Sequence, residues 1–90
     1  MTRTVSLQIT YQGGRPLAAY LYLASNGNRE VARSEEAGGD LVVDYSTDGS
    51  PVGIEILSPT ATTMENVWVL CDRLGIERPS ADDLSPLSAA

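Results

Sequence analysis

The sequence contains no histidine, no phenylalanine and no lysine, and its single cysteine is Cys71. The absence of histidine removes the commonest general base and the commonest transition-metal ligand. A single cysteine excludes an intramolecular disulfide and a zinc site that is built from several thiolates. We therefore expect that the protein is not an enzyme and that it has no catalytic residues, no cofactor and no metal site.

Positive charge is scarce as well, because six arginines stand against twelve acidic residues and the net charge at pH 7 is −6. A nucleic-acid-binding surface needs clustered basic residues that neutralise phosphates, so we expect no nucleic acid partner. No apolar run approaches the roughly 20 residues of a membrane-spanning helix, and the first residues lack the apolar core of a signal peptide. The sequence favours a cytoplasmic protein without membrane association.

The chain does contain short segments in which apolar and polar residues alternate, which is the pattern of half-buried strands. These segments span residues 4–11, 17–23, 29–36 and 40–57, and turns rich in glycine or asparagine separate them. The charged residues of the segment 29–36 suit an edge strand. The last segment is long enough for two strands.

Residues 40–57 predict one β-hairpin, closed by Asp48 and Gly49 in a two-residue type I′ turn. Counting outward from this turn gives three apolar pairs on one face: Tyr45 with Val52, Val43 with Ile54, and Leu41 with Ile56. The other face receives two pairs that contain both acids: Asp44 with Gly53, and Val42 with Glu55. A shift by one residue would mix the two faces, so the pattern selects this register.

After Pro59 the spacing of apolar residues changes to three and four, which predicts an amphipathic helix that ends near Gly75. Its apolar stripe consists of Met64, Val67, Trp68, Cys71 and Leu74. On this stripe we expect the cysteine to be a buried and unreactive thiol. We expect residues 76–90 to form a mobile tail, with at most one helical turn at 82–87, outside a single domain of residues 1–75.

These elements predict an α+β fold: an antiparallel β-meander of four or five strands with one C-terminal amphipathic helix packed on one face. A single helix leaves the second face of the sheet uncovered. An aromatic and aliphatic centre with charges around it is typical of a protein interface. The candidate interface on this uncovered face consists of Tyr20, Tyr22, Val42, Asp44 and Glu55.

Two groups of acids on the hairpin invite comparison with functional sites. Asp44 and Glu55 could act as a catalytic pair, but an open sheet face offers no pocket that would shift their pKa values. Asp40, Asp44 and Asp48 stand four residues apart, whereas a calcium loop needs ligands two residues apart and a bidentate acid at its end. We interpret these acids as solvated side chains and a turn residue.

The hairpin also resembles the hallmark of a family of short bacterial proteins whose domain has no known function. The residues that carry the resemblance are Asp44-Tyr45, Asp48-Gly49 and the run from Val52 to Leu57. The resemblance extends loosely back to Ile9, with Gln12 and Ala18 or Ala19 where the family has acids. It implies a non-enzymatic partner protein, because members are sometimes encoded beside a small ribonuclease-like toxin and are suspected to be its antitoxin.

The sequence therefore predicts a small non-catalytic protein-interaction domain. It is either a homodimer, with Tyr20 and Tyr22 in the contact, or an antitoxin-like partner of a basic protein encoded nearby. The alternative is a small-ligand-binding or sensory domain with a pocket between sheet and helix.

Overall fold

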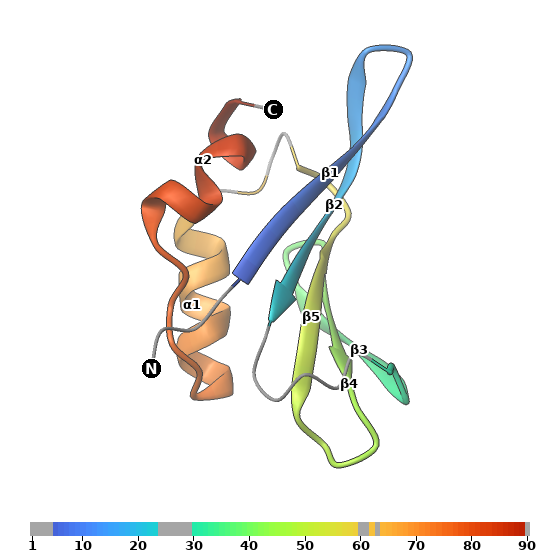
Figure 1. Ribbon diagram of the computed structural model, residues 1–90, viewed down its shortest axis with the longest axis vertical. Coiled ribbons are helices and arrows are strands. Elements are labelled where there is room, and N and C mark those ends of the chain that lie inside the picture. Colours follow the sequence, from blue (N-terminus) through green and yellow to red (C-terminus); the bar gives the residue numbers. More distant parts are fainter. Residues whose placement is uncertain (1–4, 24–29, 60–61, 63, 90) are drawn as a thin grey trace.

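The computed structural model describes residues 5–23, 30–59, 62 and 64–89. It has one five-stranded antiparallel sheet and two helices, so the predicted α+β class is confirmed (Figure 1). The strands are β1 (Val5–Gln12), β2 (Arg15–Leu23), β3 (Arg33–Gly38), β4 (Leu41–Tyr45) and β5 (Pro51–Ile56). The helices are α1 (Met64–Leu74) and α2 (Ala81–Ala89).

The strand order is β1-β2-β5-β4-β3, which differs from a simple meander at one place. Strands that are joined by a hairpin turn pair with each other as expected, but β2 pairs with β5 rather than with β3. Burial explains this order, since β2 and β5 each bury three apolar side chains while five of the six residues of β3 are exposed. The charged β3 therefore lies at the edge of the sheet, as predicted.

The register of the predicted hairpin is confirmed at four pairs of β4 and β5 and wrong at the fifth. Tyr45 lies opposite Pro51, and Val52 is the extra residue of a bulge. The confirmed pairs are Leu41 with Ile56, Val42 with Glu55, Val43 with Ile54, and Asp44 with Gly53.

The bulge follows from the turn, which is not the predicted type I′ turn at Asp48 and Gly49. Only Gly49 has a positive φ there, of 85°. The amide of Gly49 donates to the carbonyl of Ser46 at 3.0 Å, and the amide of Ser46 donates to the carbonyl of Ser50 at 2.9 Å. This is a three-residue loop with a glycine in the left-handed region. Asp48 is a turn residue, as expected, because it accepts from the hydroxyl of Ser46 and the amide of Ser50.

The backbone signature of a type I′ turn, a positive φ at both central residues, occurs instead between β3 and β4, and also between β1 and β2 at Gly13 and Gly14. Gly39 and Asp40 both have a φ of 59°, and Gly38 pairs with Leu41 on either side of them. Asp40 tolerates this conformation as aspartate and asparagine often do.

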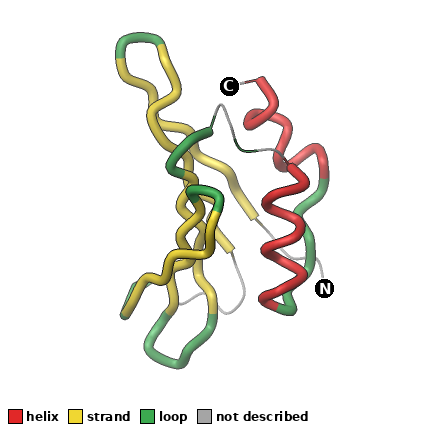
Figure 2. Tube along the Cα trace, turned by 180° about the vertical axis from the view of Figure 1, so that it is seen from behind, coloured by secondary structure: helices red, strands yellow, loops and turns green. Residues whose placement is uncertain are grey.

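Both helices pack on the same face of the sheet, and the opposite face is left uncovered (Figure 2). The core between sheet and helices is apolar, and its fully buried side chains include Leu21, Val43, Ile54, Ile56, Val67, Cys71 and Leu84. The burial of the cysteine is as expected. Gly75, with a φ of 70°, ends α1, and its amide and that of Ile76 donate to the carbonyls of Asp72 and Cys71.

The C-terminal segment differs from the single helical turn that the sequence predicts. α2 has nine residues, and its Leu84 and Leu87 belong to the core, at 0% and 2% exposure. Ser80 caps it, because its hydroxyl accepts from the amide of Asp83 while its own amide donates to the Asp83 carboxylate. Residues 81–89 therefore complete the core, and the mobility of residues 76–90 stays a prediction.

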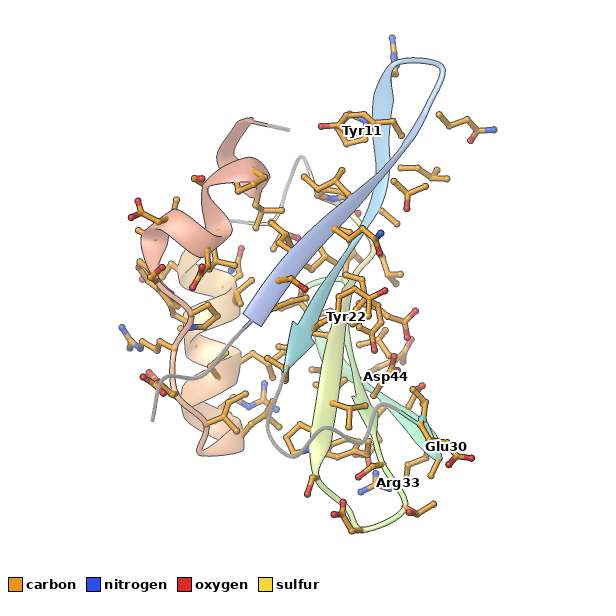
Figure 3. All side chains as sticks on the ribbon, in the orientation of Figure 1. Tyr11, Tyr22, Glu30, Arg33 and Asp44 are labelled. Atoms are coloured by element: carbon orange, nitrogen blue, oxygen red, sulfur yellow. The ribbon has the colours of Figure 1, made fainter. Side chains whose placement is uncertain are left out.

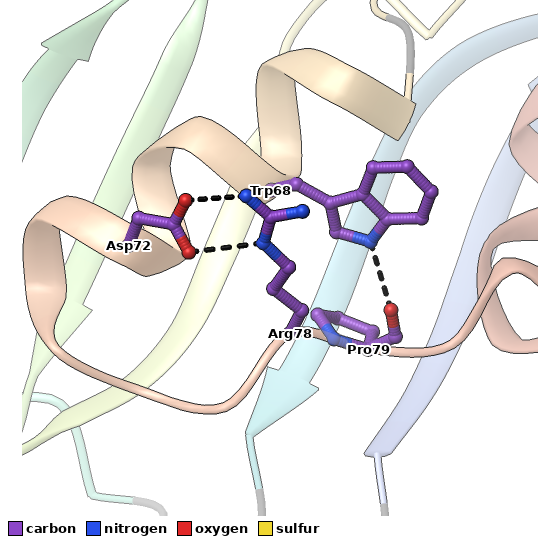
Figure 4. A network of polar contacts seen from close by, with 4 residues as sticks. All are labelled: Trp68, Asp72, Arg78 and Pro79. Carbon is purple, nitrogen blue, oxygen red and sulfur yellow. Dashed lines mark hydrogen bonds and ion pairs between the residues drawn. The ribbon is translucent and has the colours of Figure 1, made fainter.

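The connection between the helices is tied to α1 by side chains (Figure 4). The indole Nε1 of Trp68 donates to the carbonyl of Pro79 at 2.8 Å. The guanidinium of Arg78 donates to both carboxylate oxygens of Asp72, at 3.0 and 2.6 Å, and this contact lowers the pKa of Asp72. Trp68 is thus half-buried between α1 and this connection rather than central in the core. Neither described helix has the length and apolar content needed to cross a bilayer.

Candidate functional site

The register brings polar and aromatic side chains together in two rows on the face opposite the helices. One row runs across β2, β5, β4 and β3 through Tyr20, Glu55, Val42 and Glu36. The adjacent row runs across the same strands through Tyr22, Gly53, Asp44 and Ser34. We call these eight residues the outer-face patch. Figure 3 shows Tyr22 and Asp44 on the side of the sheet away from the helices.

Tyr20 is held across the sheet by a glycine and an acid. A Cβ on Gly53 would lie 2.1 Å from the Cε1 and hydroxyl oxygen of Tyr20, so the ring rests directly on the bare backbone of β5. The hydroxyl then reaches β4, where it donates to Oδ2 of Asp44 at 2.7 Å. The ring of Tyr22 packs beside it, with ring centroids 4.7 Å apart. This glycine therefore provides the space that fixes the position of an aromatic side chain.

Asp44 is buried on this face, which corrects the expectation of a solvated acid. Its exposure is 4%, and its second carboxylate oxygen accepts from the hydroxyl of Ser34 at 2.6 Å. Because Tyr20 and Ser34 occupy one oxygen each, the carboxylate is satisfied within the protein. The sheet face is not simply open, since a tyrosine covers part of it.

The buried acid changes the titration of its neighbours. Burial, followed by the hydrogen bond and the charge of Asp44, raises the pKa of Tyr20 above its ordinary value of 10.0. A hydrogen bond with Asp44, partial burial and the charge of Asp44 raise the pKa of Glu55 above its ordinary value of 4.5. Negative charge is therefore concentrated at the centre of the patch.

The outer-face patch contains three acids and no arginine. Arg33, on β3, packs its guanidinium 4.1 Å from the ring centroid of Tyr45 and forms an ion pair with Glu35. Arg15 lies at the far end of β2, where it pairs with Gln12 beside the hairpin turn. The electrostatic character of the patch is therefore acidic.

The five residues of the predicted interface lie together on this face, although their role as an interface stays a prediction. Sequence reasoning missed Ser34, Glu36 and the part that Gly53 plays. A glycine in the middle of a strand pattern was the available signal, since it marks a place where another group approaches the backbone closely.

The three aspartates of the hairpin do not converge on a common point. Asp40 accepts from the hydroxyl of Ser58 at 2.9 Å, and Asp44 and Asp48 have the separate partners given above. Hydrogen bonds from Ser46 and the Ser50 amide lower the pKa of Asp48. In the part of the chain that the structure describes, no three histidine, cysteine or acidic residues are grouped as metal ligands would be.

Two hollows lie between β3 and α1, where the alternative prediction places a ligand pocket. Their volumes are about 120 and 270 Å³, and both are lined by Ala37, Leu70 and Arg73. The guanidinium of Arg73 bridges the two elements by donating to the carbonyl of Ala37 at 3.3 Å. Pockets for small organic ligands usually measure roughly 300–1,000 Å³, so these hollows are small for that purpose.

A comparison with known families finds a match over the part of the chain that holds the outer-face patch. Residues 18–58 match the family described as protein of unknown function, DUF2283. The expected resemblance to a domain of unknown function is thereby confirmed, and the matched span contains all eight residues of the patch. No curated protein and no solved structure matches the chain significantly.

Proposed function

We propose that this protein is a non-catalytic interaction domain that binds a basic partner protein through the outer-face patch. The observation that carries the proposal is the composition of the patch, which combines two tyrosines with three acids on a sheet face that neither helix covers. Aromatic residues with a charged border are typical of interfaces, and complementary charge gives them specificity.

The charge of the patch favours a basic partner over a second copy bound through the same face. In a two-fold contact through this face, the acids of one copy would meet the acids of the other, because such interfaces place the same surface on both sides. Like charges in contact cost several kcal/mol. We therefore no longer favour the homodimer in which Tyr20 and Tyr22 form the contact.

The two tyrosines suit the recognition of arginine or lysine side chains. A guanidinium can stack on a tyrosine ring, and the contact of Arg33 with Tyr45 is an example within this chain. Asp44 and Gly53 already hold the ring of Tyr20 in place, so little conformational entropy is lost when a partner binds. Glu36 and Glu55 are then the acids that pair with the partner's cations.

An antitoxin-like role is the specific form of this proposal that the family resemblance supports. A ribonuclease-like toxin presents basic groups to RNA, and an acidic sheet face would occupy the same groups. The direct test is co-elution with the protein encoded beside this gene, measured by size-exclusion chromatography with light scattering.

The location of binding can be tested without knowing the partner, by titrating an oligo-arginine peptide into nitrogen-15-labelled protein. We expect amide shifts to concentrate on β2, β4 and β5 and to disappear in high salt. The double variant Glu36→Gln, Glu55→Gln should bind about three- to tenfold more weakly, as expected for the loss of two exposed charge pairs.

The matched control removes the same amount of charge from the helices, by Glu65→Gln with Asp82→Asn. This control should bind the peptide within about twofold of the wild type, because its changes lie on the other side of the sheet. Equal weakening in both double variants, or shifts spread over the whole surface, would mean that only net charge attracts the peptide and would refute the proposed site.

A further inference from the structure

The two edges of the sheet differ in how they are protected from other strands. β3, at one edge, carries Arg33, Glu35 and Glu36 and has a bulge at Ala37, between Glu36 and Gly38. β1, at the other edge, has eight residues and contains no charged residue and no proline. Charged side chains, prolines, bulges and short length are the usual means by which an edge strand avoids pairing with another strand. β1 has no charged residue and no proline, and it is longer than β3.

β1 also leaves one border of the core incompletely covered. Leu7 and Ile9 point to the helix side and are only partly buried against the core. Tyr11, further along the same strand, is 57% exposed and lies near the tip of the β1–β2 hairpin (Figure 3). Within the described residues, the backbone of β1 pairs with β2 alone. A further strand beside β1 would satisfy its free backbone groups and extend the apolar surface at this border.

The sequence of β1 is complementary to itself when two copies run antiparallel around Gln8. This arrangement places Leu7 opposite Ile9 of the other copy on the helix side. On the outer side it places Ser6 opposite Thr10, and each Gln8 opposite its own equivalent. Apolar residues meet apolar residues, polar residues meet polar residues, and no like charges come together.

We propose that two copies of this chain join through β1, antiparallel about Gln8, so that their five-stranded sheets form one continuous sheet. The free edge is a template for a further strand, and a second copy supplies one with matching faces. Each copy carries a net charge of −6, but β1 contains no charged residue, so pairing at this edge brings no acids into contact.

This pairing is independent of the proposed binding to a basic partner. Its two-fold axis stands perpendicular to the sheet, so the helices of both copies lie on one side and both outer-face patches lie uncovered on the other. A dimer built in this way can bind two basic partners, and failure of either proposal leaves the other intact.

The test uses opposite charges at Gln8, whose side chain is exposed and accepts a hydrogen bond from the hydroxyl of Tyr22. Light scattering of the wild type at about 100 µM, far above a micromolar Kd, should give twice the chain mass of 9.6 kDa. In a dilution series, Gln8→Glu alone and Gln8→Lys alone should each dissociate at a concentration about two- to fivefold higher than the wild type does, because like charges then meet at the two-fold axis. An equimolar mixture of the two variants should dissociate at the wild-type concentration or below it, because opposite charges then meet at the axis.

The mixture separates loss of pairing from loss of folding, since a variant that cannot fold would not pair again. Thr47→Glu and Thr47→Lys, in the exposed loop between β4 and β5, are matched controls that should keep the wild-type mass. The proposal is overturned by a wild type that stays at the mass of one chain. It is also overturned if either Gln8 variant alone dissociates at the same concentration as the wild type, or if the mixture dissociates at the higher concentration of the single variants.

Discussion

Replacing Gly53 by alanine would place a methyl group where the ring of Tyr20 now lies, 2.1 Å from its nearest atoms. The backbone of Gly53 lies in a regular strand without a positive φ, so alanine itself meets no backbone strain there. The ring must therefore leave its position above β5, and the 2.7 Å hydrogen bond from Tyr20 to Asp44 must break.

The cost follows from two opposing effects. A hydrogen bond to a charged acceptor contributes about 1.5–3 kcal/mol to the free energy of unfolding. Alanine in place of a strand glycine returns about 0.5–1 kcal/mol, because glycine loses more backbone entropy on folding. Gly53→Ala should therefore destabilise the protein by about 1–2 kcal/mol.

The same substitution should have the opposite sign when the ring is absent. In a Tyr20→Ala background the methyl group meets no aromatic ring, and Gly53→Ala should stabilise the protein by about 0.5–1 kcal/mol. The coupling between the two positions would then be about 1.5–3 kcal/mol, which is expected only for residues in direct contact.

Urea denaturation of the wild type, both single variants and the double variant measures this coupling, with constant m-values as the check on two-state behaviour. If Gly53→Ala has the same effect with and without the tyrosine, the ring does not rest on Gly53. A wild-type-like stability of the Gly53→Ala single variant would refute the reasoning in the same way.

Three further predictions test other parts of the structure by the same denaturation assay. Leu84→Ala should cost about 2–5 kcal/mol, because this side chain is fully buried; a cost near zero would place α2 outside the core. Trp68→Phe should cost about 0.5–1.5 kcal/mol through loss of the bond to Pro79, and an unchanged stability would contradict that contact. The raised pKa of Glu55 means that the folded state holds this proton more tightly than the unfolded state, so stability falls as the pH rises through 4.5 and then through the folded pKa. Glu55→Gln should thus be more stable than the wild type at pH 7 and equal to it below about pH 4, and a gain at both pH values would exclude this explanation.

The sequence specifies strand faces better than it specifies turns. Alternation alone predicts which side chains of β4 and β5 share a face, because a one-residue slip would bury Asp44 and Glu55 in the core. The Asp48-Gly49 pair suggests a two-residue turn by itself, yet the hydroxyl of the buried Ser46 bonds to Asp48 and favours the three-residue loop. That contact depends on neighbours that a dipeptide rule does not consider.

The length of α2 could not be predicted because its support comes mainly from tertiary contacts. Pro86 lies inside the helix and cannot donate to the carbonyl of Asp82, which is normally a reason to end a helix. The hydroxyl of Ser85 donates to that carbonyl at 2.9 Å and replaces the missing bond. Among the described side chains of α2, those buried in the core are Leu84 and Leu87, too few to form a recognisable period in the sequence.

The candidate site depends on strand order, which local patterns leave open. The sequence predicts that Tyr20, Tyr22 and Asp44 point to one face. It does not predict that β2 lies beside β5, and only this neighbour relation lets Tyr20 cross Gly53 and reach Asp44. The order is decided by burial over the whole sheet, so it became visible only in the folded structure.

The network at Asp44 also makes the proposed binding sensitive to pH. Both oxygens of Asp44 are occupied by Tyr20 and Ser34, so its charge is not free to meet a partner, but it raises the pKa of Glu55. A cation from a basic partner favours the ionised form of Glu55, and by linkage the ionised form binds the cation more strongly. Affinity for the oligo-arginine peptide should therefore fall as the pH is lowered through the raised pKa of Glu55. In Glu55→Gln this dependence should be lost, and if that variant kept the full pH dependence of the wild type, another acid would be the one that meets the partner.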